Sequence, residues 1–179
     1  MAWVDCTIGD LCDSVSITYR ENAERVVLIN TSDVLDGKIL NHEPIANEGL
    51  KGQFKKTFAL NDILFSEIRP SNKRFAFIDF HDTQQYIAST KLMVIRPRTE
   101  RVRPRFLYAL LTAQTVIDEL QRMAETRSGT FPQITFTGEV APIPVKLPPI
   151  EIQDSIVSII SSIEEKIEGN RKINHNLAA

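Results

Sequence analysis

The chain has few of the residues that usually bind metals, form disulfides or span membranes. Its 179 residues include 2 cysteines and 3 histidines, and no hydrophobic run approaches the ~20 residues of a membrane span. Cys6 and Cys12 are too few for a disulfide framework and lack the companions of a metal site, so we expect small, half-buried thiols, with a short-range redox pair as the alternative. The polar N-terminus lacks signal-peptide character. These absences predict a cytoplasmic protein with no membrane partner.

Signatures of catalysis are missing as well. His42, His81 and His175 are scattered along the chain, and the pair His81-Asp82 lacks the further ligands that a phosphohydrolase metal site requires. The sequence contains no Gly-rich phosphate loop, serine nucleophile elbow or dinucleotide fingerprint. We therefore predict no catalytic residue and no metal-binding residue in this chain.

The charged residues are unevenly distributed, although the formal net charge is only −2. Residues 1–50 contain 3 Lys and Arg against 9 Asp and Glu, residues 51–127 contain 14 against 8, and residues 128–179 contain 4 against 6. A basic middle segment between acidic flanks suits a protein that binds phosphate groups on one face. Ordinary fluctuation of charge along the chain is the alternative.

The hydrophobic pattern predicts an α+β fold, in which short strands surround one main helix. Apolar residues at helical spacing place this helix at residues 106–123. The expected strands cover residues 26–29, 63–68, 75–80, 86–95 and 141–147, and prolines mark the last of them as an edge strand.

A long C-terminal helix of the coiled-coil type is predicted from the spacing of its isoleucines. Pro149 suits a first helical turn, and apolar residues four and three positions apart form a stripe that is typical of a helix packed on another helix. Asn170 occupies a seam position, where a polar residue can fix the register of pairing. The predicted partner interface comprises Ile152, Ile156, Ile159, Ile163, Asn170, Ile173 and Leu177. The alternative is a terminal helix folded back on its own domain.

One loop has the residues expected of a contact with double-stranded DNA. Phosphates are bound by cations and backbone N–H groups, whereas base edges are read by side chains with paired donors and acceptors. Arginine can bind guanine O6 and N7, and asparagine can pair with adenine N6 and N7. The hairpin-like loop at residues 69–74 supplies both kinds of group in Arg69, Ser71, Asn72, Lys73 and Arg74. A solvated hairpin tip is the alternative.

Two further segments complete the predicted DNA-binding set. Lys55 and Lys56 belong to a basic loop that would contact phosphates. The segment after the main helix combines charge, hydroxyl groups and a glycine that permits close backbone approach, and its glutamine could read adenine. Its members are Arg127, Ser128, Gly129, Thr130 and Gln133, with a glycine-capped helix end as the alternative. The densest group of cations is predicted instead to be a solvated face, formed by Arg96, Arg98, Arg101, Arg103 and Arg105.

The C-terminal segment LPPIEIQDSIVSIISSIEEKIEGNRKIN resembles the conserved helical region of the specificity subunit of type I restriction–modification systems. The matching positions are Leu147, Pro148, Pro149, Gln153, 156–168 and 170–174. The upstream chain resembles the target-recognition domain of the same family more loosely, at residues 8–12, 60–66, 127–130 and 134. Asn61 stands where that family commonly has glycine, so the turn there is expected to differ in detail.

The resemblance implies a target-recognition domain at residues 1–147 and a helical spacer and dimerisation region at residues 148–179. Full specificity subunits are similar to two such units in tandem, so this single unit would be a half-subunit or a fragment. In that family the specificity subunit is non-catalytic and directs adenine N6 methylation by methyltransferase subunits, which bind S-adenosylmethionine. A restriction and motor subunit can join them. A half-subunit would pair with a second copy through its helix, whereas an adaptor that never binds DNA is the alternative.

Overall fold

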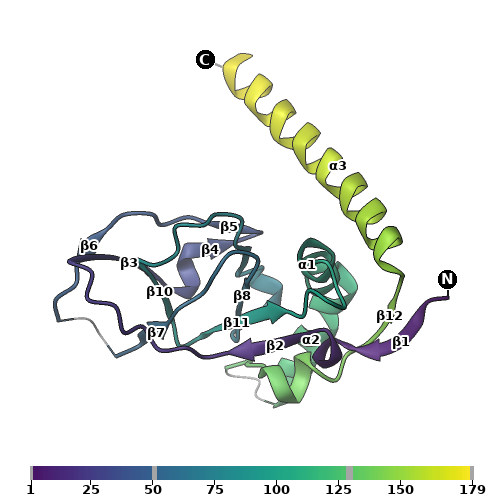
Figure 1. Cartoon of the computed structure of the whole chain (residues 1–179), viewed down its shortest axis with the longest axis horizontal. Helices are drawn as coiled ribbons and strands as arrows, with labels where there is room; N and C mark the ends of the chain where they lie inside the picture. Colours follow the sequence, from purple (N-terminus) through teal and green to yellow (C-terminus); the bar gives the residue numbers. More distant parts are fainter. Residues whose placement is uncertain (1, 50–51, 128–130, 178–179) are drawn as a thin grey trace.

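The chain folds into two packed β-sheets and a helical layer, from which one long helix extends (Figure 1). The computed structural model describes residues 2–49, 52–127 and 131–177. The first sheet is antiparallel and has the order β2 (Cys12–Val15), β11 (Leu92–Pro97), β8 (Ile63–Ser66), β9 (Phe75–Phe77). The second sheet has the order β6 (Ile45–Ala46), β3 (Arg25–Ile29), β10 (Tyr86–Ser89), β7 (Phe54–Lys56), with β3 and β10 parallel.

The remaining elements connect or cover these sheets. β1 (Val4–Thr7) pairs with β12 (Pro144–Leu147), and β4 (Val34–Leu35) pairs with β5 (Lys38–Ile39), both antiparallel. The helices are α1 (Pro104–Thr112), α2 (Gln114–Arg127) and α3 (Ile150–Leu177). Single helical turns are η1 (Ile8–Asp10), η2 (Thr31–Asp33), η3 (Pro70–Asn72) and η4 (Phe136–Val140). The predicted α+β class is confirmed, and no helix in the described part of the chain is long and apolar enough to cross a membrane.

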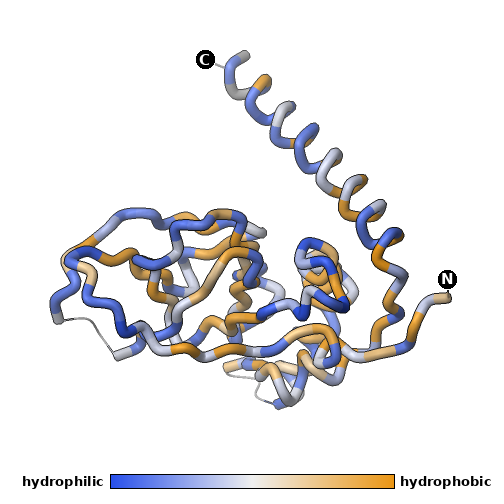
Figure 2. Tube along the Cα trace, in the orientation of Figure 1, coloured by the Kyte–Doolittle hydropathy of each residue, from blue (hydrophilic) through white to orange (hydrophobic). Residues whose placement is uncertain are grey.

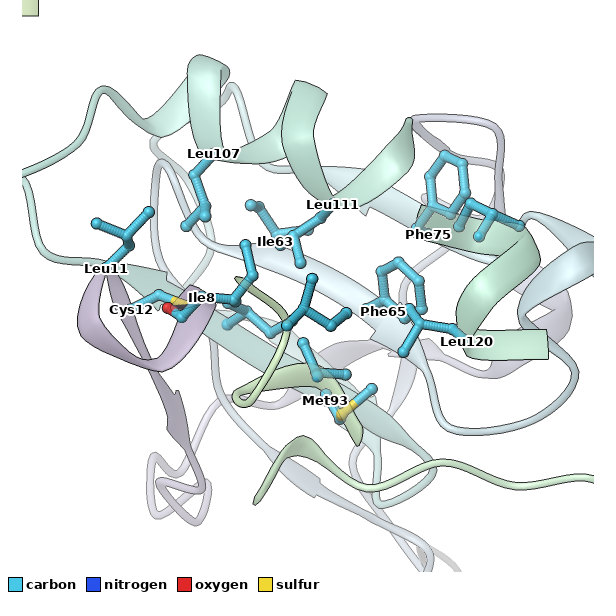
Figure 3. Packing of buried hydrophobic residues seen from close by; sticks show 14 of the residues in the cluster. Ile8, Leu11, Cys12, Ile63, Phe65, Phe75, Met93, Leu107, Leu111 and Leu120 are labelled. Carbon is cyan, nitrogen blue, oxygen red and sulfur yellow. Dashed lines mark hydrogen bonds between the residues drawn. The ribbon is translucent and has the colours of Figure 1, made fainter. Parts of the chain in front are cut away.

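Strands β11, β8 and β9 of the first sheet are buried on both faces, and β8 is accordingly hydrophobic at three of its four positions. Successive side chains of a strand point to opposite sides. Ile63 and Phe65 therefore belong to the core cluster beneath α1 and α2, together with Leu111 and Leu120 (Figure 3). Leu64 points the other way, into the cluster between the two sheets. Each fully buried side chain of this size contributes about 1.5–3 kcal/mol relative to its exposed state.

Two predicted elements are each divided in two. The expected strand at 86–95 is interrupted at Thr90 and Lys91, so that β10 lies in the second sheet and β11 in the first. The expected helix at 106–123 starts earlier and breaks at Ala113, whose ψ of 134° ends α1. The Ala113 carbonyl then accepts hydrogen bonds from the N–H groups of Val116 and Ile117, which begins α2. The other expected strands are present as β3, β8, β9 and β12, with different ends.

The five arginines between residues 96 and 105 remain partly or fully exposed, and each also has a polar partner. Asp62 is 1% exposed and accepts two hydrogen bonds from Arg96, from Nε at 2.8 Å and Nη2 at 2.7 Å. The other partners are Asp13 for Arg98, the Asp10 carbonyl for Arg101, Asp154 for Arg103, and both Asp79 and Glu164 for Arg105. These side chains join segments that are distant in sequence.

The long helix α3 is fixed to the globular part through its first turns. Gln153 is 1% exposed, and its Oε1 accepts from the Arg103 N–H at 2.8 Å while its Nε2 donates to the Pro148 carbonyl at 2.9 Å. The Arg103 guanidinium donates to both carboxylate oxygens of Asp154. Farther along, the ion pair between Lys38 and Glu168 at 3.5 Å is exposed. Exposed pairs contribute little, so the orientation of α3 is set mainly at its base.

Candidate nucleic-acid interface

Segments that the sequence singled out for DNA binding meet at the turn between β10 and β11. The Thr90 N–H donates to the Gln53 carbonyl at 2.7 Å, which places the turn beside β7 and its lysines. The Glu67 N–H donates to the Lys91 carbonyl at 3.0 Å, which places the same turn beside the end of β8. β8 leads directly into the loop at residues 69–74.

The loop after β8 also lies against the segment that follows α2. Ile68 and Gln133 form an antiparallel β-bridge, and the Arg69 N–H donates to the Pro132 carbonyl at 3.2 Å. Three sequence segments that are far apart in the chain are therefore held together by backbone hydrogen bonds. Backbone hydrogen bonds of this kind fix the relative positions of the loops independently of their exposed side chains.

Lys91 occupies the centre of this surface, and the sequence prediction missed it. Its Nζ lies 3.4 Å from Gln133 Oε1 and 3.7 Å from Glu67 Oε2, and its side chain is 49% exposed. A sequence signal was present, because Ser89, Thr90 and Lys91 interrupt an otherwise apolar run. We name the three side chains Gln133, Lys91 and Glu67 the polar triad.

The loop at residues 69–74 has a backbone that L-amino acids adopt rarely. Arg69 and Lys73 have φ of 45° and 52° and flank η3. Left-handed conformations of bulky residues cost of order 1–3 kcal/mol and cluster at functional sites. The Ser71 N–H donates to Gln121 Oε1 on α2 at 3.1 Å, which anchors the loop, while the side chains of Ser71 and Asn72 are exposed. The geometry therefore fits a rigid loop that presents polar side chains.

The far end of this loop faces a different part of the molecule. Lys73 lines an open cleft of about 850 Å³ between α3, α1 and the β4–β5 hairpin. Arg74 Nη1 donates to the carbonyls of Ser32 and Val34 at 3.1 and 3.3 Å. Arg74 therefore ties β9 to the segment around η2, and the structure separates these two cations from Arg69.

The two lysines of β7 have different surroundings, as alternate residues of a strand must. Lys55 is exposed. Lys56 Nζ donates to the carbonyls of Thr90 and Leu92 at 3.0 and 2.8 Å, and burial lowers the pKa of Lys56. Lys56 thus fastens β7 to the turn that carries Lys91, and Lys55 is the better placed of the two to contact a phosphate.

Arg127 is held at the end of α2 by an acidic partner. Its Nη1 lies 2.6 Å from Glu139 Oε1, and Glu139 Oε2 also accepts from the Thr135 N–H at 2.6 Å and hydroxyl at 3.0 Å. Burial raises the pKa of Glu139, but the hydrogen bonds from Thr135 and the charge of Arg127 outweigh it and lower the pKa overall. The side chain of Arg127 remains 54% exposed. The predicted residues Ser128, Gly129 and Thr130 lie outside the described residues.

The predicted partner stripe on α3 is largely exposed to solvent. Apolar and polar residues alternate along this helix (Figure 2). Ile159 is the most exposed member of the stripe at 62%, and Ile152, Ile163 and Ile173 are exposed as well. Ile156 is half-buried against the core of the globular part. The side chain of Leu177 lies outside the described residues, and Asn170 is exposed.

Comparison with known proteins gives the class of this chain. Residues 2–179 match the model of the type I restriction modification DNA specificity domain, so the chain belongs to that family. It is 43% identical over 176 residues to the type I restriction enzyme HindI specificity subunit of Haemophilus influenzae. That alignment covers 98% of this chain and 38% of the relative, so the chain spans less than two fifths of that protein's length.

Solved structures agree with this family. The HsdS subunit of Thermoanaerobacter tengcongensis superposes with a TM-score of 0.78 at 25% identity, covering 96% of this chain and 44% of that one. A chain from work on complex assembly and conformational transition of the type I R-M system has a TM-score of 0.79 at 25% identity, with the same coverage. The S subunit of M. genitalium is 12% identical with a TM-score of 0.57, which shows a shared fold. The resemblance seen in the sequence is thereby confirmed.

Proposed function

We propose that this chain reads one half of a split target in double-stranded DNA, as the recognition unit of a type I specificity subunit. The observation that carries the proposal is the convergence of β7, the β10–β11 turn, the loop after β8 and the segment after α2, in a chain of the DNA specificity family. Exposed cations such as Lys55 and Arg69 would contact phosphates, while polar side chains between them would contact base edges.

In this proposal α3 is a spacer and a partner-binding arm. Its 28 residues extend about 42 Å at 1.5 Å per residue, long enough to separate two recognition units. The exposed stripe around Ile159 and Ile163 would pack on a second helix, from a second copy of the chain or from a second unit of a longer subunit. Two copies related by two-fold symmetry would read a palindromic split site.

The chemistry would come from partner subunits in the cytoplasm. The chain itself would be non-catalytic. Methyltransferase subunits, with S-adenosylmethionine bound to them, would methylate adenine N6 at the site that this chain selects, and a restriction and motor subunit could join the complex. The adaptor that never touches DNA receives no support from the family match or from the relatives.

The test is a map of N6-methyladenine in cells that express the chain with its cognate methyltransferase, against cells without the chain. A split motif that requires the chain is expected. Palindromic halves would indicate a homodimer, and unlike halves would indicate a second recognition unit. If the two proteins co-purify and the methyltransferase is folded, yet no motif appears, the chain does not select the site.

A further inference from the structure

The polar triad has a fixed order, with Lys91 in the middle. Lys91 Nζ contacts both other members of the triad, Gln133 Oε1 at 3.4 Å and Glu67 Oε2 at 3.7 Å. The backbone reinforces this order, because the Glu67 N–H donates to the Lys91 carbonyl at 3.0 Å and the N–H of Ile134 donates to the Glu67 carbonyl at 2.9 Å. The three side chains are therefore presented from connected backbone segments.

The hydrogen-bonding capacity of these groups determines which of them donate and which accept. An ammonium group only donates, so the atom of Gln133 that faces Lys91 must be its amide oxygen. Gln133 then offers its two N–H groups. A carboxylate only accepts, so Glu67 offers its oxygens. Read from Gln133 to Glu67, the triad presents a donor, a donor and an acceptor.

That order matches one base pair in the major groove. A G·C pair presents the acceptors N7 and O6 of guanine followed by the N4 amino donor of cytosine. An A·T pair presents an acceptor, the N6 amino donor and then an acceptor, so the central ammonium of Lys91 would face another donor. We propose that the triad reads a single G·C pair of the half-site, with Gln133 and Lys91 on guanine and Glu67 on cytosine. This inference rests on the proposed function.

The same geometry argues against the adenine contact predicted for Gln133. A bidentate amide contact with adenine requires the amide oxygen to accept from N6. Lys91 already donates to one of the two lone pairs of that oxygen, so the N6 amino group of adenine would have to approach beside a positive charge. The side chain of Glu67 is 23% exposed and that of Lys91 is 49% exposed, so both can be reached by a base edge without unfolding of the loop.

The first experiment maps the methylation motif for the chain with its cognate methyltransferase, as the wild type and as Lys91→Met and Gln133→Ala. Both variants are expected to relax the motif at the same single G·C position and to leave the other positions unchanged. The matched control is Lys146→Met on β12, because Lys146 is 73% exposed and its carboxylate partner Asp5 is 82% exposed. This control is expected to give the wild-type motif.

The second experiment measures binding of the same complexes to duplexes altered at that position. Replacement of guanine by 7-deazaguanine removes N7, and we expect wild-type affinity to fall about 5- to 150-fold, the range for loss of one good base contact. Inosine retains N7 and O6 and should bind like guanine. The Gln133→Ala complex should bind the 7-deazaguanine and guanine duplexes equally, since its contact with N7 is already lost.

Three results of these experiments would contradict the assignment of the triad to a G·C pair. If both variants keep the wild-type motif, or if they relax an A·T position, the triad does not read a G·C pair. If affinity falls equally for every sequence, Lys91 contacts phosphate only and the base-reading assignment is wrong. If the wild type itself yields no motif, the proposed function fails and the inference fails with it, an outcome distinct from a wild-type motif that the variants leave unchanged.

Discussion

The glutamine at the base of α3 offers the sharpest test of how the arm is held. Substitution of Gln153 by methionine nearly preserves the side-chain volume, so the cavity cost is small. It removes the acceptor of the Arg103 N–H and the donor to the Pro148 carbonyl, both in a site where Gln153 is 1% exposed. Each buried group left without a partner costs about 1–3 kcal/mol, so the expected loss of stability from the two groups is about 2–6 kcal/mol.

That loss has two measurable forms. In thermal unfolding, a loss of 1 kcal/mol lowers the Tm of a chain of this size by about 2–4 °C, so the expected decrease in Tm is about 4–24 °C. If α3 detaches before the globular part unfolds, the loss appears instead as faster amide hydrogen exchange in the first turns of α3. The control is Gln114→Met, because Gln114 is exposed and bonds only with an exposed carboxylate among the described contacts, and it should change stability by less than about 0.5 kcal/mol. Wild-type Tm together with wild-type exchange for Gln153→Met would refute this account of the anchor.

Three other substitutions test separate parts of the structure. Ile159→Asp places a charge on the exposed stripe of α3 and should abolish self-association or co-purification with the partner subunit, as measured by gel filtration. Its Tm should stay within about 2 °C of the wild-type value in thermal unfolding. Lys55→Ala should reduce the slope of log K against log salt by about 0.9 if Lys55 contacts one phosphate, and an unchanged slope in DNA titrations would remove it from the interface. Because the pKa of Glu139 is lowered in the folded state, ionised Glu139 stabilises the fold at pH values above 4.5, its ordinary pKa. This stabilisation is lost as the pH falls through the lowered pKa. Glu139→Gln should therefore reduce the loss of stability that urea unfolding measures between about pH 5 and pH 3.

The sequence predicted those features that depend on local pattern. Strands such as β3 and the helix α3 follow from hydrophobic periodicity, and the loop at residues 69–74 was identified from its composition. The break at Ala113 has no comparable signal, because alanine is the strongest helix former and neither proline nor glycine is adjacent. The break lets both α1 and α2 pack on the core cluster that includes Ile63 and Phe65, and hydrophobic periodicity along the chain does not reveal such a tertiary arrangement.

The roles of individual cations were the least predictable. Lys55 and Lys56 are adjacent residues of the same type. The pairing of β7 in the second sheet nevertheless leaves Lys55 exposed and directs Lys56 to the backbone carbonyls of Thr90 and Leu92. Arg96 belongs to a partly exposed face, and its buried carboxylate partner, Asp62, lies 34 residues away in the sequence. The fold brings the segments around Glu67 and Gln133 beside Lys91, although all three are far apart in the sequence. These side-chain contacts depend on the tertiary structure, and local sequence propensity does not determine them.

The pairing of β1 with β12 has a consequence for how such units can be rearranged. This two-stranded ribbon sets Val4 opposite Leu147, directly before the helix α3 begins at Ile150 (Figure 1). The polypeptide therefore enters and leaves the globular part at one place, a geometry that tolerates insertion and circular permutation. Under the proposed function, exchanging the residues between these two strands for those of a relative should change the DNA half-site while the start of the arm stays the same, so that selectivity and assembly would vary independently.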